Sequence, residues 1–218
     1  MQRFALLHDG SDQGWHAAYT AFHVAARLGA PLLVLLDSST AGEPLLAERA
    51  SQVQVGARAA GVAIETRQVT DFSLPVVLER VAAVDGLFVP SSLVSDAEGA
   101  LRYLEALSRP LWIIADESTA SEMTVLVNDM RTDANLLHYA KTLAHRLRQT
   151  LKGIIKESEL APSPEENGAV SWIALPDLSL PALTSVLNQT ESSLVFMPAS
   201  IISLLPDLLF NCVIYPAA

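Results

Sequence analysis

The sequence predicts an α/β fold made of two related units, each with a mostly parallel five-stranded sheet flanked by helices, of which the second unit is reduced. Short apolar segments alternate with amphipathic segments bounded by Gly, Pro and Asp, which is typical of parallel strands joined by helical crossovers. Motifs of the first half also recur in the same order in the second half, which indicates an internal repeat. Half of the 218 residues are apolar, so the chain can bury a substantial core.

The first unit is expected over residues 1–116. An apolar strand over 4–8 runs into a DGSD turn at 9–12, whose side chains can cap the following helix, and Gly29 is the expected end of that helix. The same kinds of signal predict strands over 32–36, 62–69, 86–89 and 111–115, and helices over 44–60, from Ser73 with Pro75 in its first turn, and from a Ser95–Glu98 capping box to Leu107.

Residues 117–122 are polar and rich in Ser and Thr, and we expect them to link the first unit to a second one over 123–218. The repeated features are Asp9 and Asp129 after a strand, His16 and His23 against His138 and His145, DFSLP at 71–75 against DLSLP at 177–181, and VPSS at 89–92 against MPAS at 197–200. The expected elements are a long helix over 132–151, a strand near Ile154, strands over 171–175, 194–197 and 212–215, and a helix over 179–189. LAPSPEENG at 160–168 predicts an exposed loop where the first unit has its second helix, and Pro206 allows at most a broken helix over 201–210.

The composition excludes some classes of function. With 24 acidic and 14 basic residues the net charge is −10, which argues against a sequence-independent nucleic-acid surface. Cys212 is the only cysteine and lies in an apolar run, so we expect a buried, reduced thiol. The N-terminus lacks the apolar region of a signal peptide, and no apolar run is long enough to span a bilayer, so a cytoplasmic protein is expected.

Three segments carry a resemblance to the universal stress protein family: the DGSD turn, GAPLLVLL at 29–36, and VTDFSLPVVLERVAAVDGLFVP at 69–90. The resemblance covers residues 3–115 well and residues 123–215 weakly, mostly through the repeat. The chain is therefore similar to a tandem, two-domain member of that family with a degenerate second domain. This similarity implies an adenine-nucleotide-hydrolase-like fold for each unit.

Members of the family that bind ATP carry a G-x-x-G pattern after the fourth strand, followed by G-S or G-T, and the backbone amides of this loop cradle the ribose and phosphates. The corresponding stretch here is VPSSLVSDAEGALRY, with Ser91 and Val94 in place of the two glycines and Asp96 and Glu98 where the phosphates would lie. The second copy, MPASIISLLPDLL, has no glycine there. The resemblance therefore implies that both phosphate sites are lost and that no cofactor is bound.

Seven residues could still form a ligand site in the first unit: Asp9, Gly10, Ser11, Val89, Pro90, Ser91 and Ser92. Asp9 matches the family acid that contacts adenine, and it follows a strand, at the edge where open α/β sheets bind ligands. The alternative is that Asp9 only begins the turn and caps the helix. Asp129, followed by Met and Arg, is a weaker match.

Other chemistry has less support. The repeated histidines stand in pairs two helical turns apart, roughly 10 Å, which is too far to bind one metal ion. No metal site is expected unless equivalent histidines meet across the repeat, the alternative being half-buried, hydrogen-bonded rings. The motifs G-x-S-x-G and G-x-G-x-x-G are absent. Trp15, Trp112 and Trp172 are expected in the core or at an interface.

These observations favour a non-enzymatic stress-response or regulatory protein that acts through contacts with a protein partner and does not bind ATP. The alternative is a module that binds ATP or AMP in an altered pocket of the first unit. A third hypothesis, a small hydrolase, would need a nucleophile, a base and an orienting group in one cleft. The apolar last strands, LWIIA at 111–115 and CVIYP at 212–216, resemble the edges through which the family's domains pair. We therefore expect the two units to pair through these strands with pseudo-twofold symmetry. The paired chain is also a candidate for further association into a homodimer.

Overall fold

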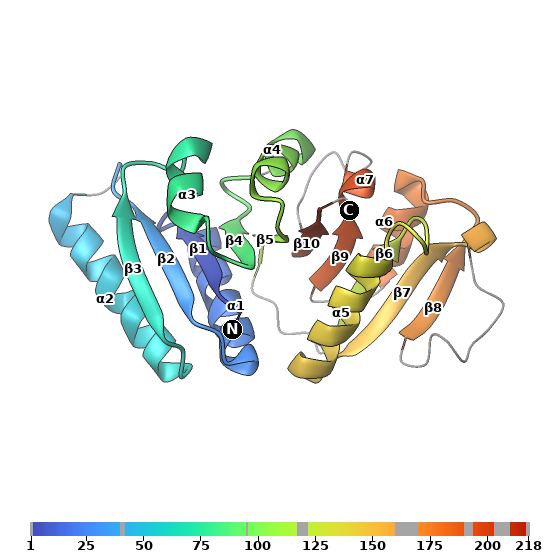
Figure 1. The fold of residues 1–218 in the computed structure, drawn as a ribbon, viewed down its shortest axis with the longest axis horizontal. Helices are drawn as coiled ribbons and strands as arrows, with labels where there is room; N and C mark the ends of the chain where they lie inside the picture. Colours follow the sequence, from blue (N-terminus) through green and yellow to red (C-terminus); the bar gives the residue numbers. More distant parts are fainter. Residues whose placement is uncertain are drawn as a thin grey trace.

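The protein, described here from a computed structural model, is built on one continuous ten-stranded sheet with helices on both faces (Figure 1). The structure describes residues 2–39, 42–94, 96–116, 122–159, 170–189, 194–202 and 210–216. The strand order is β3-β2-β1-β4-β5-β10-β9-β6-β7-β8. The strands are β1 (Phe4–His8), β2 (Leu32–Asp37), β3 (Ile64–Val69), β4 (Gly86–Pro90), β5 (Leu111–Ile114), β6 (Glu122–Val127), β7 (Thr150–Lys156), β8 (Val170–Leu175), β9 (Leu194–Pro198) and β10 (Cys212–Tyr215).

The helices divide between the two faces of this sheet. They are α1 (Asp12–Leu28), α2 (Glu43–Ala59), α3 (Leu74–Val81), α4 (Ala97–Leu107), α5 (Ala134–Leu147), α6 (Leu180–Gln189) and α7 (Ala199–Ile202). Residues of α1, α2 and α5 pack into one core cluster, and residues of the other four helices pack into a second cluster on the opposite face. Among the described residues, no helix combines the length and apolarity that crossing a bilayer requires.

The first half follows the predicted order of elements closely. Strand β1 is buried along its whole length because it pairs in parallel with both β2 and β4 and is covered on both faces. Helix α1 ends at Gly29, whose φ of 62° is left-handed, as the sequence predicts. The expected capping box of α4 is wrong: Asp96 is the N-cap and accepts from the Gly99 amide, while Ser95 lies outside the described residues.

The second half repeats the strand order of the first, with β6, β7, β8, β9 and β10 in the positions of β1 to β5. The long helix expected over 132–151 is wrong, because α5 ends at Leu147, where Arg148 adopts a left-handed φ of 58°. The chain then forms β7, which is longer than the short strand expected near Ile154. The loop expected at 160–168 lies outside the described residues, as does most of the stretch around Pro206.

The two halves meet at β5 and β10, the junction, which is the one antiparallel pair among the described strands. Cys212 lies opposite Ile113 and Val213 opposite Trp112, so the pairing is the one expected from the two apolar last strands. The fully buried ring of Trp112 packs against Phe88, with ring centroids 4.7 Å apart, and against Phe196 at 6.2 Å. The core is therefore continuous across the junction. Most of the linker expected over 117–122 is outside the described residues, and Glu122 already belongs to β6.

Candidate functional site

The carboxyl end of β1 carries a hydrogen-bonded group formed by Asp9, Ser11 and Ser92, which we call the Asp9 cluster. Asp9 Oδ1 accepts from the Ser11 backbone N–H at 2.9 Å and from Ser11 Oγ at 2.6 Å. Asp9 Oδ2 accepts from Ser92 Oγ at 2.7 Å. Both carboxylate oxygens are thus occupied, and the cluster ties the β1–α1 turn to the loop after β4.

The hydrogen bonds of the Asp9 cluster keep its carboxyl ionised. Burial alone would raise the pKa of Asp9, but the bonds from Ser11 and Ser92 outweigh burial and hold that pKa below its ordinary value. Ser11 also caps α1, because its Oγ accepts from the Gly14 N–H at 3.0 Å. Asp9 therefore begins the turn at the carboxyl end of β1, but the expectation that it also caps the helix is wrong, because Ser11 is the N-cap.

Gly14 and Arg49, which sequence reasoning missed, enclose the cluster together with the predicted Gly10. Gly14 has no room for a side chain, since a Cβ there would collide with Asp9 Oδ1 and lie 2.8 Å from His8 Nδ1. Gly10 has a left-handed φ of 80°, and the Arg49 guanidinium covers it. Arg49 Nη1 also donates to the Asp9 carbonyl oxygen at 3.3 Å. Arg49 belongs to α2, in the βα unit after the one that contains this turn, and no sequence signal links the two.

His8 is fully buried beneath the turn and is neutral. Its Nδ1 accepts from the Gly10 N–H at 3.4 Å, and its ring meets Trp15 edge to face with centroids 4.4 Å apart. Burial lowers the pKa of His8, the Asp9 carboxylate opposes this shift and the Arg49 guanidinium adds to it, and the net result is a pKa of about 4. Its Nε2 has no hydrogen-bond partner within the described part of the chain.

The stretch at the end of β4 lacks the glycines of a phosphate loop, and its residues bond to or pack against other parts of the chain. Val89 and Pro90 are buried in the strand, and the Ser91 N–H donates to the Ile114 carbonyl at 2.9 Å. Val94 is 2% exposed and packs in the core. At the start of α4, Asp96 Oδ1 accepts from the Gly99 N–H at 2.8 Å. Of the predicted site residues, the structure brings Asp9, Ser11 and Ser92 into contact, whereas Val89 and Pro90 serve the core.

The second half has a cavity of about 490 Å³ at the carboxyl ends of β6, β9 and β10. Asn128, Arg131, Ser200 and Tyr215 are among its lining residues. The acid that organises this turn is Asp133, whose Oδ2 accepts from the Asn128 and Asp129 amides at 2.8 and 3.1 Å. Asp129, the counterpart of Asp9 in the repeat, instead accepts from amides of its own turn. The repeat therefore places Asp129 at the carboxyl end of β6, as Asp9 is placed at the end of β1, but the backbone of this turn is held mainly by Asp133.

The repeated histidines are separate from both sites. His16 Nδ1 lies 3.7 Å from Asp116 Oδ1, and the other three rings are exposed on α1 and α5. Within the described ranges, no three His, Cys, Asp or Glu side chains are grouped so that they could hold a metal ion.

Comparison with known proteins identifies the fold. No protein-family model and no curated protein matches the chain. A universal stress protein from Archaeoglobus fulgidus has a similar structure, with a TM-score of 0.67, 13% identity, and coverage of 99% of this chain and 98% of that one. A protein of unknown function from Pseudomonas aeruginosa PAO1 has a TM-score of 0.71 at 10% identity, covering 100% and 93%. A candidate universal stress protein from Pseudomonas aeruginosa UCBPP-PA14 has a TM-score of 0.71 at 11% identity, covering 100% and 94%. The chain thus shares the fold of these proteins over its whole length.

Proposed function

We propose that the chain is a cytoplasmic, non-enzymatic protein of the universal stress protein type, with two tandem domains, that acts through contacts with other proteins and does not bind ATP in its first half. The shared fold with proteins of similar length supports the type of protein. One observation carries the absence of ATP binding: the groups that would hold a nucleotide at the end of β4 already have partners within the chain.

These partners occupy both ends of the site. The Asp9 carboxylate already accepts from Ser11 and Ser92, so a base that donates to Asp9 Oδ2 would have to share that oxygen with Ser92 or displace it. The Ser91 amide donates to Ile114, which removes a donor that a phosphate would need. The Asp96 carboxylate lies at the N-terminus of α4, where an anion would otherwise bind, and it would repel a phosphate.

Isothermal titration with ATP, AMP and cyclic AMP tests this proposal. We expect no heat of binding at micromolar concentrations. The matched variant is Ser92→Ala, which frees Asp9 Oδ2 but leaves the Asp96 carboxylate in place. This variant should likewise show no binding of the three nucleotides. Micromolar binding by the unmodified chain that disappears in Asp9→Ala would contradict the proposal and establish the altered pocket of the first half.

A second candidate function is nucleotide binding in the second half, and the cavity beside β6 and β9 favours it. The volume of about 490 Å³ lies within the usual range for small-molecule sites. Arg131 supplies a positive charge and Tyr215 an aromatic ring among the lining residues. The same titrations distinguish the two sites, because binding in the second half should be lost in Arg131→Ala and retained in Asp9→Ala.

A further inference from the structure

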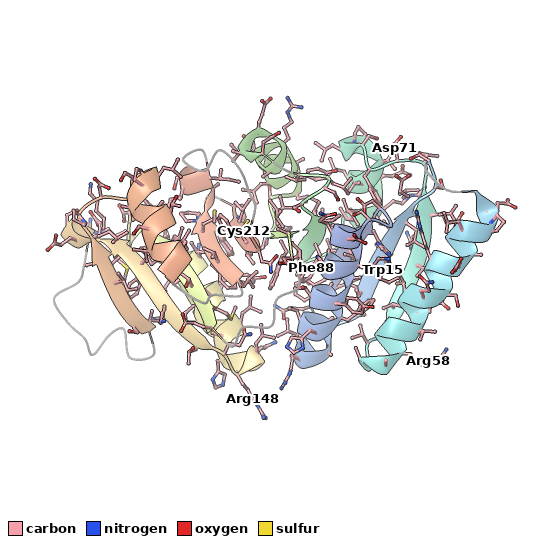
Figure 2. The ribbon with its side chains drawn as sticks, turned by 180° about the vertical axis from the view of Figure 1, so that it is seen from behind. Trp15, Arg58, Asp71, Phe88, Arg148 and Cys212 are labelled. Atoms are coloured by element: carbon pink, nitrogen blue, oxygen red, sulfur yellow. The ribbon has the colours of Figure 1, made fainter. Side chains whose placement is uncertain are left out.

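A groove separate from both sites runs between α1 and α2 on the outer surface of the first half. Its volume is about 650 Å³. Figure 2 shows the two helices side by side, with Trp15 between them. The lining residues Trp15 and Tyr19 come from α1, and Val55 and Gly56 come from α2.

The apolar side chains of this groove remain open to solvent. Tyr19 is 53% exposed and Val55 is 63% exposed, so neither stabilises the fold by full burial. The rings of Trp15 and Tyr19 lie 6.2 Å apart with an interplanar angle of 37°. Because Trp15 also packs against the buried His8 ring, its indole is held in place as a wall of the groove. A flat apolar molecule lying between the helices would cover these aromatic surfaces.

The residues of α2 that line the groove have small or polar side chains, and Gly56 also allows α2 to pack closely against α1. Gly56 lies against Phe22, and a Cβ on Gly56 would be 3.1 Å from the Phe22 ring. Ser51 and Gln52 line the groove one turn earlier, with short or polar side chains. The core-facing residues of α2 in this region, Val53 and Ala57, are fully buried on the other side of the helix. The helices are therefore packed through their core faces, and the outer groove is left unfilled.

The charges around the groove favour a cation. Asp12 lines it and is exposed. Glu48 lies beside it, since its Oε1 accepts from Gln52 Nε2 at 3.1 Å. The nearest basic side chain on this part of α2, Arg49, is directed to the Asp9 carbonyl and the Gly10 turn. His16 of α1 also lines the groove, and its Nδ1 lies 3.7 Å from Asp116 Oδ1. The carboxylates of Asp12 and Glu48 make the local charge negative, in a chain whose net charge is −10.

We propose that the groove between α1 and α2 is a binding site for a small organic cation with a flat aromatic body. The aromatic walls of Trp15 and Tyr19 attract a cation through their ring faces. Asp12 provides a carboxylate at the edge of the groove, and the volume suits a ligand of small-molecule size. This ligand class is distinct from the anionic nucleotides considered for the carboxyl edge of the sheet.

Three indole ligands that differ in charge test the proposal by isothermal titration with the full chain: tryptamine as the cation, tryptophol as the neutral analogue and indole-3-propionate as the anion. We expect tryptamine to bind about tenfold more tightly than tryptophol, and indole-3-propionate to bind most weakly. In nitrogen-15 NMR spectra, tryptamine should shift the indole N–H signal of Trp15 more than those of Trp112 and Trp172.

Variants then assign each contribution. Tyr19→Ser should weaken tryptamine about tenfold by removing an aromatic wall, and Asp12→Asn should bring tryptamine and tryptophol to similar affinities. Val55→Lys adds a like charge at an exposed position that tolerates it, and should abolish tryptamine binding. The control is Leu180→Ser on α6, also an exposed apolar residue at 37%, which should change nothing. The proposal is overturned if none of the three ligands binds, if the anion binds best, or if tryptamine binding survives both Tyr19→Ser and Val55→Lys.

Discussion

At the scale of single residues, Gly14 is the position where one added methyl group should be most damaging to the Asp9 cluster. Gly14→Ala should lower the free energy of unfolding by about 1–3 kcal/mol, because its Cβ would press on Asp9 Oδ1 and His8 Nδ1. Gly99→Ala is the matched control: both glycine amides are bonded by the N-cap side chain three residues earlier, but a Cβ on Gly99 meets nothing closer than 3.4 Å. Urea unfolding measures both, and equal stabilities would contradict the prediction.

A second prediction at the scale of residues is that His8 makes the stability of the fold depend on pH. Its pKa is about 4 in the folded chain and 6.5 ordinarily, so the unfolded chain binds the extra proton between these values. Stability should therefore fall as the pH is lowered from 6.5 to 4, by roughly 3 kcal/mol. Urea unfolding at a series of pH values should show this loss in the unmodified chain.

The matched variant for the pH series is His8→Asn, whose side-chain oxygen can still accept from the Gly10 N–H. This variant should lose the dependence in that window and keep the loss below pH 3.8, because the pKa of Asp9 is lowered in the folded chain and its protonation therefore destabilises the fold. An identical pH profile for the two proteins would show that His8 is not the titrating group.

At the scale of elements, the ends of helices show what a sequence can predict. Gly29 ends α1 with a left-handed backbone, and this was predicted because glycine adopts that conformation without strain. Arg148 and Ser108 end α5 and α4 in the same way. Neither residue type signals a left-handed cap, so α5 was predicted to run four residues too far, to 151.

The candidate site was predictable to the same limited degree. Asp9, Ser11 and Ser92 were identified through the resemblance to universal stress proteins, which points to the turn after the first strand and the loop after the fourth, and Asp9 also because it follows a strand at one edge of the sheet. The contacts made by Arg49 and the burial of His8 depend on how α2 packs beside α1, which no local pattern encodes. The groove lined by Tyr19 and Val55 was missed for the same reason, since their helical periodicity does not reveal which face is left without a neighbour.

The left-handed end of α5 leads to a prediction of increased stability. Arg148→Gly should raise the free energy of unfolding by about 1 kcal/mol, because glycine relieves the backbone strain at a φ of 58°. Lys141→Gly, in the interior of the same helix, should lower it by about 1 kcal/mol. Thermal unfolding of the two variants separates the cases, and a loss of stability in Arg148→Gly would be inconsistent with a strained cap.

At the scale of the whole molecule, Trp112 should couple the two halves. Trp112→Ala should cost about 3–5 kcal/mol and should speed hydrogen exchange in both β4 and β9, because the ring contacts Phe88 and Phe196. Trp172→Ala, on the edge strand β8, is the control and should speed exchange only in β7 and β8. Hydrogen exchange followed by mass spectrometry measures this, and an effect of Trp112→Ala confined to β4 would contradict the coupling.

The junction also determines which surfaces remain for a homodimer. Because β5 and β10 are already paired with each other, a second copy of the chain cannot use them while the halves remain joined. The strands at the two ends of the sheet are β3 and β8. Light scattering of the purified chain measures the oligomeric state, and a dimer would have to form through other surfaces than the apolar last strands.

The rate at which Cys212 is alkylated can measure how often the two halves separate. It is the only thiol in the chain, it is fully buried opposite Ile113, and burial raises its pKa to about 12, so an alkylating reagent cannot modify it while β5 and β10 are paired. The alkylation rate in native buffer therefore measures how often β5 and β10 separate. If that rate exceeds the rate of global unfolding, the junction opens while the two halves remain folded, which exposes β5 and β10 to a strand of a protein partner. If the two rates agree, the ten strands unfold as one cooperative unit.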